Sequence, residues 1–432
     1  KDVVDNIINV SGIVDVSSVS TQGGKIVLSG GDAGNVTVSG ILDASGDTGG
    51  EIVITGQAVG ALDGAVLDAS GANGGGKINF GGAFQGGDEL PGSEYTYIDN
   101  NAILRANAEQ NGDGGDIVVW SDGNTIFKGD IEAKGGANSG NGGNVEASGL
   151  IFLSFKGFVD TSALNRLAGI LLLDPENFVL RLGTNDSSND GDNANNSWID
   201  PVSSTSSNTF ADGTASEIWE SEIEGQNTNF ILRARRNFSV TGTSADGTVA
   251  LQNDRSLTIQ TENGTGMAGT IDLTGSTHGN NLLFRTSGTG NITIQAGVQG
   301  LTAGNIILSR LQSQNGNIFV DANNGSVTGN GTINATGTGA ITLSADAGIL
   351  DLNGAVTSNG GLIQASASDD LIVDAAINAG TGGITLFNTG GSSGTNDTTV
   401  NAALTSTNGN IQVLAANANN VNINSTVTTG GA

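Results

Sequence analysis

Acidic residues set among glycines are the first residues of this chain whose types and spacing could do chemistry. The run from Gly112 to Asp116 reads G-D-G-G-D, which is similar to the Gly/Asp repeats that bind Ca²⁺ between successive turns. Those repeats work as tandem copies and this run stands alone, so Asp113 and Asp116 are only candidate ligands. Three more candidates share a very polar stretch that lacks the spacing of a helix-loop-helix calcium loop: Asp186, Asp190 and Asp192. Calcium is therefore the one cofactor that the sequence leaves open.

The chain offers little for catalysis. It has no Cys and one His, His278, in the loop-like run S-T-H-G-N-N. Enzymes that process polysaccharides on parallel β-helices need acidic clusters with Arg, Lys or His on one face. The adjacent carboxylates Asp369 and Asp370 have no basic neighbour in the sequence. We therefore expect a protein that is not an enzyme, we assign no catalytic residue, and we expect His278 to be solvated in its loop.

Two short motifs could bind a partner. Lys128 to Asp130 reads K-G-D, a tripeptide of the kind that integrins bind, but a predicted strand and turn would keep it away from a loop tip. The basic run R-A-R-R, from Arg233 to Arg236, is short and surrounded by acidic residues. Both motifs fit ordinary surface positions, so neither identifies a receptor.

The composition excludes several classes of protein. The 432 residues include 70 Gly, no Cys and only 13% charged residues, with a formal net charge of -28, whereas a typical globular chain is about a quarter charged with about 7% Gly. The glycines lack the three-residue period of collagen, and runs of Val, Ile and Leu argue against disorder. The negative charge argues against nucleic acid as a partner. No apolar run approaches the roughly 20 residues that span a bilayer, so we expect no membrane insertion.

A phrase of two small residues, a polar residue and a short β-branched run recurs along the chain. In the first part of the chain the polar residue of the phrase is Lys25, Glu51, Lys77, Asp116 and Asn144. Successive copies are therefore 26, 26, 39 and 28 residues apart. In the last part the first apolar residues fall, at steps of 23, 22, 21 and 27, at Ile318, Ile341, Ile363, Ile384 and Ile411. A unit of this length cannot bury its apolar face alone, so the units must stack on one another.

Each unit contains three short strand-like runs. The unit that begins at Ile341 shows I-T-L, then I-L-D-L, then A-V-T, and such alternation is typical of half-buried strands. Gly and Asn between the runs allow positive φ at tight corners. Three faces joined by corners predict an all-β fold, a right-handed parallel β-helix, with the hand taken from the crossover rule. Stacked side-chain amides could form ladders at the corners, at Asn291, Asn305, Asn317 and Asn410.

Two stretches interrupt the repeat. The step of 39 residues predicts an insertion over 84–100. The second interruption, 174–229, is polar, and Thr214 and Glu217 have the spacing of a capping box before Ile218, Trp219 and Ile223. We predict a short helix there, packed on the solenoid. The expected organisation is a first β-helix section over 1–173, this insertion, and a second section over 230–432 that continues the same solenoid.

The stretch from Gly114 to Leu180 carries a family resemblance. It contains G-G-D-I-V-V-W-S-D-G-N-T-I-F-K-G-D-I-E-A-K-G-G, then G-N-G-G-N-V-E-A-S-G and G-I-L-L-L-D-P-E-N. This stretch resembles the β-helical shaft of filamentous-haemagglutinin-like exoproteins of the two-partner secretion route, just after their secretion domain. Ser221 to Val240 is similar to the segment that follows in that family. The family's N-P-N-L-like secretion motifs are absent from this chain, so no transporter-binding residue is carried over.

The resemblance implies a β-helix that is exported across the outer membrane and held on, or shed from, the bacterial cell surface. Members of the family serve as adhesins, toxin-delivery stalks or matrix components. We therefore expect an extracellular structural shaft whose precursor uses an outer-membrane transporter, and we read the chain, which starts at Lys1, as a piece of a longer protein. The alternative is a subunit that associates with itself through the open β-helix ends and forms a fibre or sheath. A polysaccharide-processing enzyme is the less favoured third hypothesis.

Overall fold

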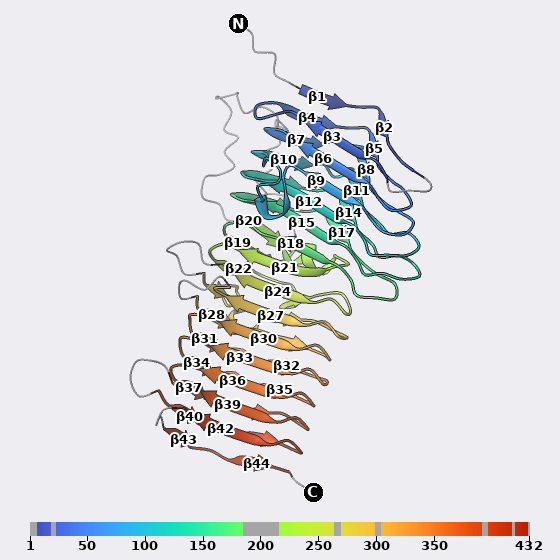
Figure 1. Cartoon of the computed structure of the whole chain (residues 1–432). Helices are drawn as coiled ribbons and strands as arrows, with labels where there is room; N and C mark the ends of the chain where they lie inside the picture. Colours follow the sequence, from blue (N-terminus) through green and yellow to red (C-terminus); the bar gives the residue numbers. More distant parts are fainter. Residues whose placement is uncertain are drawn as a thin grey trace. The chain divides into compact units, whose positions relative to one another are not determined.

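The computed structural model describes residues 7–18, 23–184, 216–262, 269–298, 304–390, 396–416 and 420–430. By its contacts the chain divides into two units. The first takes Lys1–Glu176, Asn185–Ile218 and Gly225–Ile231, and the second takes Asn177–Thr184, Trp219–Glu224 and Leu232–Ala432. The regular secondary structure of both units is almost wholly short parallel strands joined by turns (Figure 1). No helix among the described residues is long and apolar enough to cross a membrane.

The first unit is built from three parallel sheets, and each coil contributes one strand to each sheet. The first sheet has the order β1 (Ile7–Val10), β4 (Asn35–Val38), β7 (Ala58–Ala61), β10 (Tyr95–Ile98), β13 (Asn124–Phe127) and β16 (Phe152–Phe155). The second sheet has β2 (Ile13–Asp15), β5 (Ile41–Asp43), β8 (Val66–Asp68), β11 (Ile103–Arg105), β14 (Asp130–Glu132) and β17 (Phe158–Asp160). The third sheet has β3 (Lys25–Ser29), β6 (Glu51–Thr55), β9 (Lys77–Phe80), β12 (Asp116–Ser121), β15 (Asn144–Gly149) and β18 (Ile170–Leu173).

The second unit repeats the three-sheet plan. Its first sheet has β19 (Phe178–Leu182), β22 (Phe238–Gly242), β25 (Ile271–Asp272), β28 (Ile306–Leu308), β31 (Val327–Gly329), β34 (Leu350–Leu352), β37 (Leu371–Val373), β40 (Thr398–Val400) and β43 (Val421–Ile423). Its second sheet has β23 (Thr248–Ala250), β26 (Leu283–Arg285), β29 (Arg310–Ser313), β32 (Ile333–Ala335), β35 (Val356–Ser358), β38 (Ile377–Asn378), β41 (Leu404–Ser406) and β44 (Val427–Thr429). Its third sheet has β24 (Leu257–Thr261), β27 (Ile292–Ala296), β30 (Ile318–Ala322), β33 (Ile341–Ala345), β36 (Ile363–Ala367), β39 (Ile384–Asn388) and β42 (Ile411–Ala415).

The register of the coils follows the repeat in the sequence. Lys25 lies opposite Glu51, and Glu51 lies opposite Lys77. In the second unit the marker isoleucines pair in one column, Ile318, Ile341, Ile363, Ile384 and Ile411. The structure therefore confirms an all-β parallel β-helix of three-strand coils.

Alternation of buried and half-exposed residues holds in the second unit but fails in part of the first. Along β27, Ile292 and Ile294 are buried while the residues between them are half-exposed. Along β12, the five residues from Ile117 to Ser121 are all buried, so both faces of the sheet are covered there. The continuous apolar run I-V-V-W has the pattern of a strand that is buried on both faces, whereas the alternation that predicts half-buried strands holds at Ile341.

The first interruption is shorter than predicted. Tyr95 and Tyr97 belong to the regular strand β10, so the insertion ends before Tyr95 and contains the short 3-10 helix η1 (Phe84–Gly86). It packs against the outer face of the third sheet, where Trp120 is buried. The backbone N–H of Gln85 donates a hydrogen bond to Glu146 Oε2 at 2.8 Å. The insertion therefore explains part of the double-sided burial.

The second interruption contains the predicted short helix, but the predicted start was wrong. The helix α1 spans Glu220–Glu224 and follows the strand β20 (Ser216–Trp219), while Thr214 lies outside the described residues. β20 is extended because it pairs with β16, and Ser216 Oγ accepts a hydrogen bond from the N–H of Leu153 at 2.9 Å. The coil pattern also returns within the stretch predicted as an insertion, since β19 and the first residues of β21 (Asn229–Ala234) lie inside it.

The corner asparagines bond in a different way from the predicted one. The side-chain carbonyls of Asn291 and Asn317 accept backbone N–H groups one coil further on, at 2.7 and 2.9 Å, and Asn305 does the same at 3.0 Å. Amide-to-amide contacts occur at other corners, such as Asn111 with Asn73 at 3.0 Å. Asn291, Asn305 and Asn317 thus fix backbone donors of the neighbouring coil.

Candidate functional site: a charged ladder on the second sheet of the first unit

The second sheet of the first unit displays a column of charged side chains that we call the charged ladder. Its members lie at one register position on successive strands: Asp15, Asp43, Asp68, Arg105, Glu132 and Asp160. Each strand from β5 to β17 turns a buried aliphatic residue inward just before this position, as Leu42 and Leu67 do, and Val14 of β2 is half-buried. Because side chains alternate across a strand, the following charged residue faces outward. The core pattern therefore positions the ladder.

Local hydrogen bonds fix the aspartates of the ladder. The carboxylates of Asp43, Asp68 and Asp160 each accept the backbone N–H of the serine two residues later, at 2.8 to 2.9 Å. Asp15 makes the same bond at 2.8 Å, and hydrogen bonds from the side chain and backbone of Ser17 lower the pKa of Asp15. The carboxylates thus hold the turn at the end of each strand.

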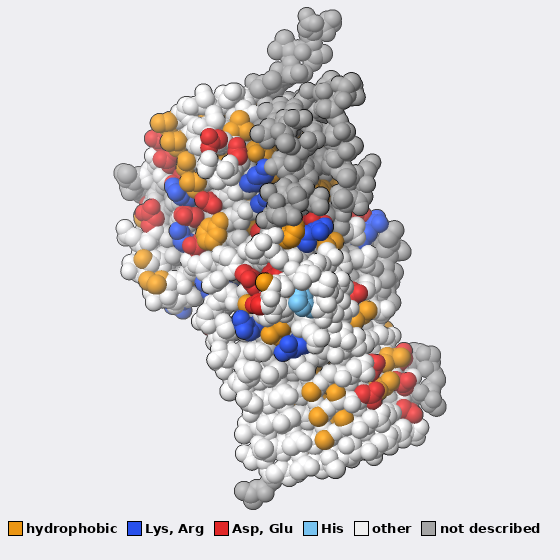
Figure 2. All heavy atoms as spheres, turned by 180° about the vertical axis from the view of Figure 1, so that it is seen from behind, with side chains coloured by type: hydrophobic (Ala, Val, Ile, Leu, Met, Phe, Trp, Pro, Cys, Tyr) orange, Lys and Arg blue, Asp and Glu red, His pale blue; other side chains and the backbone are white. Residues whose placement is uncertain are grey.

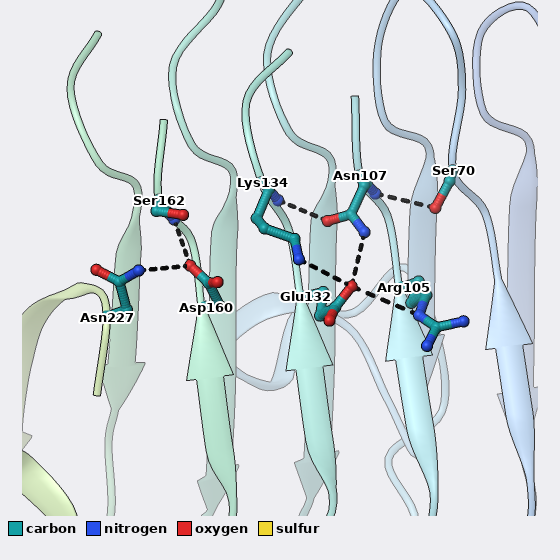
Figure 3. A network of polar contacts seen from close by, with 8 residues as sticks. All are labelled: Ser70, Arg105, Asn107, Glu132, Lys134, Asp160, Ser162 and Asn227. Carbon is teal, nitrogen blue, oxygen red and sulfur yellow. Dashed lines mark hydrogen bonds and ion pairs between the residues drawn. The ribbon is translucent and has the colours of Figure 1, made fainter. Parts of the chain in front are cut away.

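A network of polar side chains centres on Glu132 (Figure 3). Its Oε2 accepts a hydrogen bond from Asn107 Nδ2 at 2.9 Å. The same oxygen lies 3.2 Å from Lys134 Nζ and 3.5 Å from Arg105 Nε. The Oδ1 of Asn107 accepts the backbone N–H of Lys134 at 2.8 Å, and its own N–H donates to Ser70 Oγ at 3.2 Å. Two coils therefore meet at the Glu132 carboxylate, and Asn107 links them to Ser70 of a third coil.

The electrostatics of the network favour an ionised Glu132. Partial burial acts to raise its pKa, but the hydrogen bond from Asn107 and the charges of Lys134 and Arg105 outweigh it, so the pKa of Glu132 lies below its ordinary value. The pKa of nearby Asp130 is raised, first by partial burial and then by the charge of Glu132. Glu132 is consequently the anionic centre of the network.

The calcium candidates do not converge in the described part of the chain. Asp113 is exposed, and its Oδ1 accepts the N–H of Asn141 at 2.6 Å. Asp116 opens β12 and accepts a hydrogen bond from Asn144 Nδ2 at 3.0 Å. Asp186, Asp190 and Asp192 lie outside the described residues. Among the described residues no group of three or more His, Cys, Asp or Glu side chains could hold a metal ion.

The other residues singled out in the sequence take structural positions. His278 is half-buried in its turn, and its Nε2 donates to the carbonyl of Ser244 at 3.0 Å, so the side chain is only partly open to solvent. Lys128 lies over the ring of Tyr97, with 5.6 Å from Nζ to the centroid. Arg233 forms an ion pair with Glu262 at 3.3 Å.

An acidic cluster surrounds helix α1 in the second unit. Glu220 is buried and accepts hydrogen bonds from the N–H of Gly183 and from Ser244 Oγ, both at 2.6 Å. The pKa of Glu224 is raised by partial burial and by the charges of Glu220 and Asp246. These bonds tie the helix to its neighbours in the same unit. Elsewhere the second unit carries few charges: no Lys or Arg follows Arg310, and much of the lower surface in Figure 2 is uncharged.

Sequence reasoning missed the charged ladder although a signal was present. L-D-A-S occurs at Leu42 and again at Leu67, one coil apart. The pattern has no metal-binding or catalytic spacing. Its aspartate instead accepts the backbone N–H of the serine two residues later and so holds the turn. In comparisons with known proteins, the chain matches no family model and no curated protein.

Proposed function

We propose that this chain is a section of the β-helical shaft of a large exported bacterial surface protein, similar to the filamentous-haemagglutinin-like exoproteins, and that it has no catalytic role. The observation that carries the proposal is the use of outward polar groups along the coil stack. Asp43, Asp68 and Asp160 hold turns, and Asn317 accepts a backbone donor of the next coil. Polar groups used in this way stabilise an extended scaffold.

The composition and the resemblance of Gly114 to Leu180 support the same proposal. A chain without Cys gains no stability from disulfides, and a continuous ladder of parallel backbone hydrogen bonds can replace them outside the cell. The net charge of -28 keeps such a surface soluble. The outer-membrane transporter would act on the precursor. We assign no receptor-binding residue within this chain.

The test is surface display of the full-length precursor. The precursor is expressed together with its partner transporter in a Gram-negative cell, and protease is added to the intact cells. The protease should digest the β-helical region. Protection of this region in intact cells, with digestion only after lysis, would overturn the proposed location. The non-catalytic role is tested separately with a panel of acidic polysaccharides, where release of reducing ends or unsaturated products would overturn it.

The fibre alternative has one observation in its favour. In the second unit the last described strands expose apolar side chains, with Val421, Ile423 and Val427 each 40 to 44% accessible. Another coil would cover them, and either a continuing chain or a second copy could supply it. Electron microscopy of the purified chain separates the two, because a shaft gives discrete short particles at high concentration whereas a fibre subunit gives uniform filaments.

A further inference from the structure

The network around Glu132 brings together the three groups that an amide-forming reaction needs. Lys134 supplies a primary amine, Asn107 supplies a carboxamide, and one carboxylate oxygen contacts both: Glu132 Oε2 lies 3.2 Å from Lys134 Nζ and 2.9 Å from Asn107 Nδ2. The carboxamide oxygen already accepts the backbone N–H of Lys134 at 2.8 Å, which polarises the carbon that an amine would attack. All three residues lie in the first unit and are drawn in Figure 3.

We propose that Lys134 and Asn107 form an intramolecular isopeptide bond that joins two successive coils, with Glu132 as the proton carrier. The neutral amine of Lys134 attacks Cγ of Asn107, and a C–N bond forms. The bond from Cγ to Nδ2 breaks, and Nδ2 leaves as ammonia after it takes the proton that Glu132 Oε2 has received from Nζ. An amine and a primary amide thus give a secondary amide and ammonia, so atoms and electrons balance without a further reactant.

The register of the sheet makes this bond geometrically accessible. β11 and β14 pair in parallel with Arg105 opposite Glu132, so the residues two positions later, Asn107 and Lys134, are also neighbours. Adjacent strands lie about 4.8 Å apart, a span that a lysine stem and an asparagine side chain bridge without movement of either strand. The N–H of Asn107 is held by Ser70 Oγ at 3.2 Å. Reacting groups fixed in this way react as if at high concentration.

The environment sets the pH dependence of the reaction. The side chains of Lys134 and Glu132 are 36% and 28% accessible, so water and bulk protons reach the site. Only the neutral amine is a nucleophile. Bond formation should therefore be slow at neutral pH and accelerate as the pH rises. Besides these two residues and Asp130, the charged groups beside the carboxylate are Arg105, at 3.5 Å, and Asp160, which lies opposite Glu132 on β17.

The chain contains a matched control. Lys25 Nζ lies 2.9 Å from Glu51 Oε2 on the neighbouring coil of the same unit. This lysine–glutamate ion pair matches the pair of Lys134 with Glu132. That carboxylate has no asparagine among the hydrogen-bond partners described for it. Lys25→Arg and Lys134→Arg each preserve the positive charge, and only the second removes the proposed nucleophile.

The test is the intact mass of the full chain after incubation at about pH 9.5, followed by tandem mass spectrometry of proteolytic peptides. A bond lowers the mass by about 17 Da, the mass of ammonia, in the wild type and in Lys25→Arg, and yields one branched peptide that contains residues 107 and 134. Lys134→Arg and Glu132→Gln should keep the full mass.

Two results would overturn the proposal. One is an unchanged mass of the wild type after prolonged incubation. The other is an equal loss in Lys134→Arg, which would assign the loss to cyclisation of an asparagine on its own backbone. If Glu132→Gln fails to fold, the comparison of the two lysine variants still decides the outcome, because each keeps its ion pair.

Discussion

Replacement of Asp321 by Asn should stabilise the second unit at neutral pH but not at acidic pH. Asp321 lies on β30 and is half-buried, and its Oδ1 is buried without a hydrogen-bond partner in the described part of the chain. Burial raises the pKa of Asp321 to about 6, and the negative charge of Asp346 adds to the effect. Ser344 donates a short hydrogen bond to Asp346, which keeps the second carboxylate in place.

The direction follows from proton linkage. The unfolded chain binds this proton with a pKa of about 3.9, so the folded state binds it more tightly. The resulting stability is fully present below about pH 4 and is lost as the pH rises through about 6. A difference of about two pH units corresponds to a ceiling of about 3 kcal/mol. Since Asp321 is half-exposed, solvent screening reduces the expected gain from Asp321→Asn at pH 7.5 to about 1 kcal/mol.

The assay is hydrogen–deuterium exchange of peptides that cover β30 and β33, because a long repeat array can unfold in pieces. Exchange in Asp321→Asn should slow at about pH 7.5 and match the wild type after correction at about pH 4.5. Asp374→Asn is the matched control, since Asp374 is exposed and Asn can still accept the hydrogen bond from Asn401 Nδ2. Asp346→Asn should give a smaller gain than Asp321→Asn. Equal stabilisation at both pH values, or a loss at pH 7.5, would refute the reasoning.

Three further predictions concern the core, the corners and calcium. Ile341→Ala removes a fully buried side chain and should cost about 2–5 kcal/mol in urea unfolding, whereas Thr342→Ala on the outer face should cost less than about 1 kcal/mol. Gly143→Ala should lower the melting temperature, since its Cβ would lie 2.0 Å from a backbone oxygen of the neighbouring coil, while Gly12→Ala meets nothing within 4 Å and should be neutral. Millimolar Ca²⁺ should raise the melting temperatures of the wild type and Asp113→Asn equally, by screening of the net charge; a rise confined to the wild type would instead reveal a specific site.

The repeat made the strands and their register predictable. Burial of the outer face of a sheet depends on contacts with segments outside the repeat, and these could not be predicted. The isoleucine column from Ile318 to Ile411 could be read directly because each coil has nearly constant length there. Trp120 and Glu146 are buried under the insertion that contains η1. The sequence of that insertion does not indicate which strands it packs against. The start of α1 was missed because pairing of β20 with β16 competes with the local helix signal of Glu217.

The candidate site shows which information was lacking. Glu132 and Lys134 are two residues apart, so their shared face is evident from the strand period. Asn107 lies a whole coil earlier, and its place beside Lys134 follows only once the register of β11 and β14 is known. A count of residues between motif copies gives that register only approximately, because corner loops differ in length. Functional residues that lie on different coils therefore could not be grouped from the sequence alone.

Register also limits what chemistry the outer faces of such a fold can perform. Adjacent strands are about 4.8 Å apart, so an outward side chain reaches mainly the in-register residues one coil before and one coil after it. Among the described residues the ion pair of Lys25 is with Glu51, whereas Lys134 lies beside Glu132 of its own coil and Asn107 of the preceding coil. A lysine is therefore placed to react only where the register also brings a carboxamide beside it. If the isopeptide bond forms at Asn107 and not near Lys25, the residues that the register places on the neighbouring coil determine where this solenoid carries reactive sites.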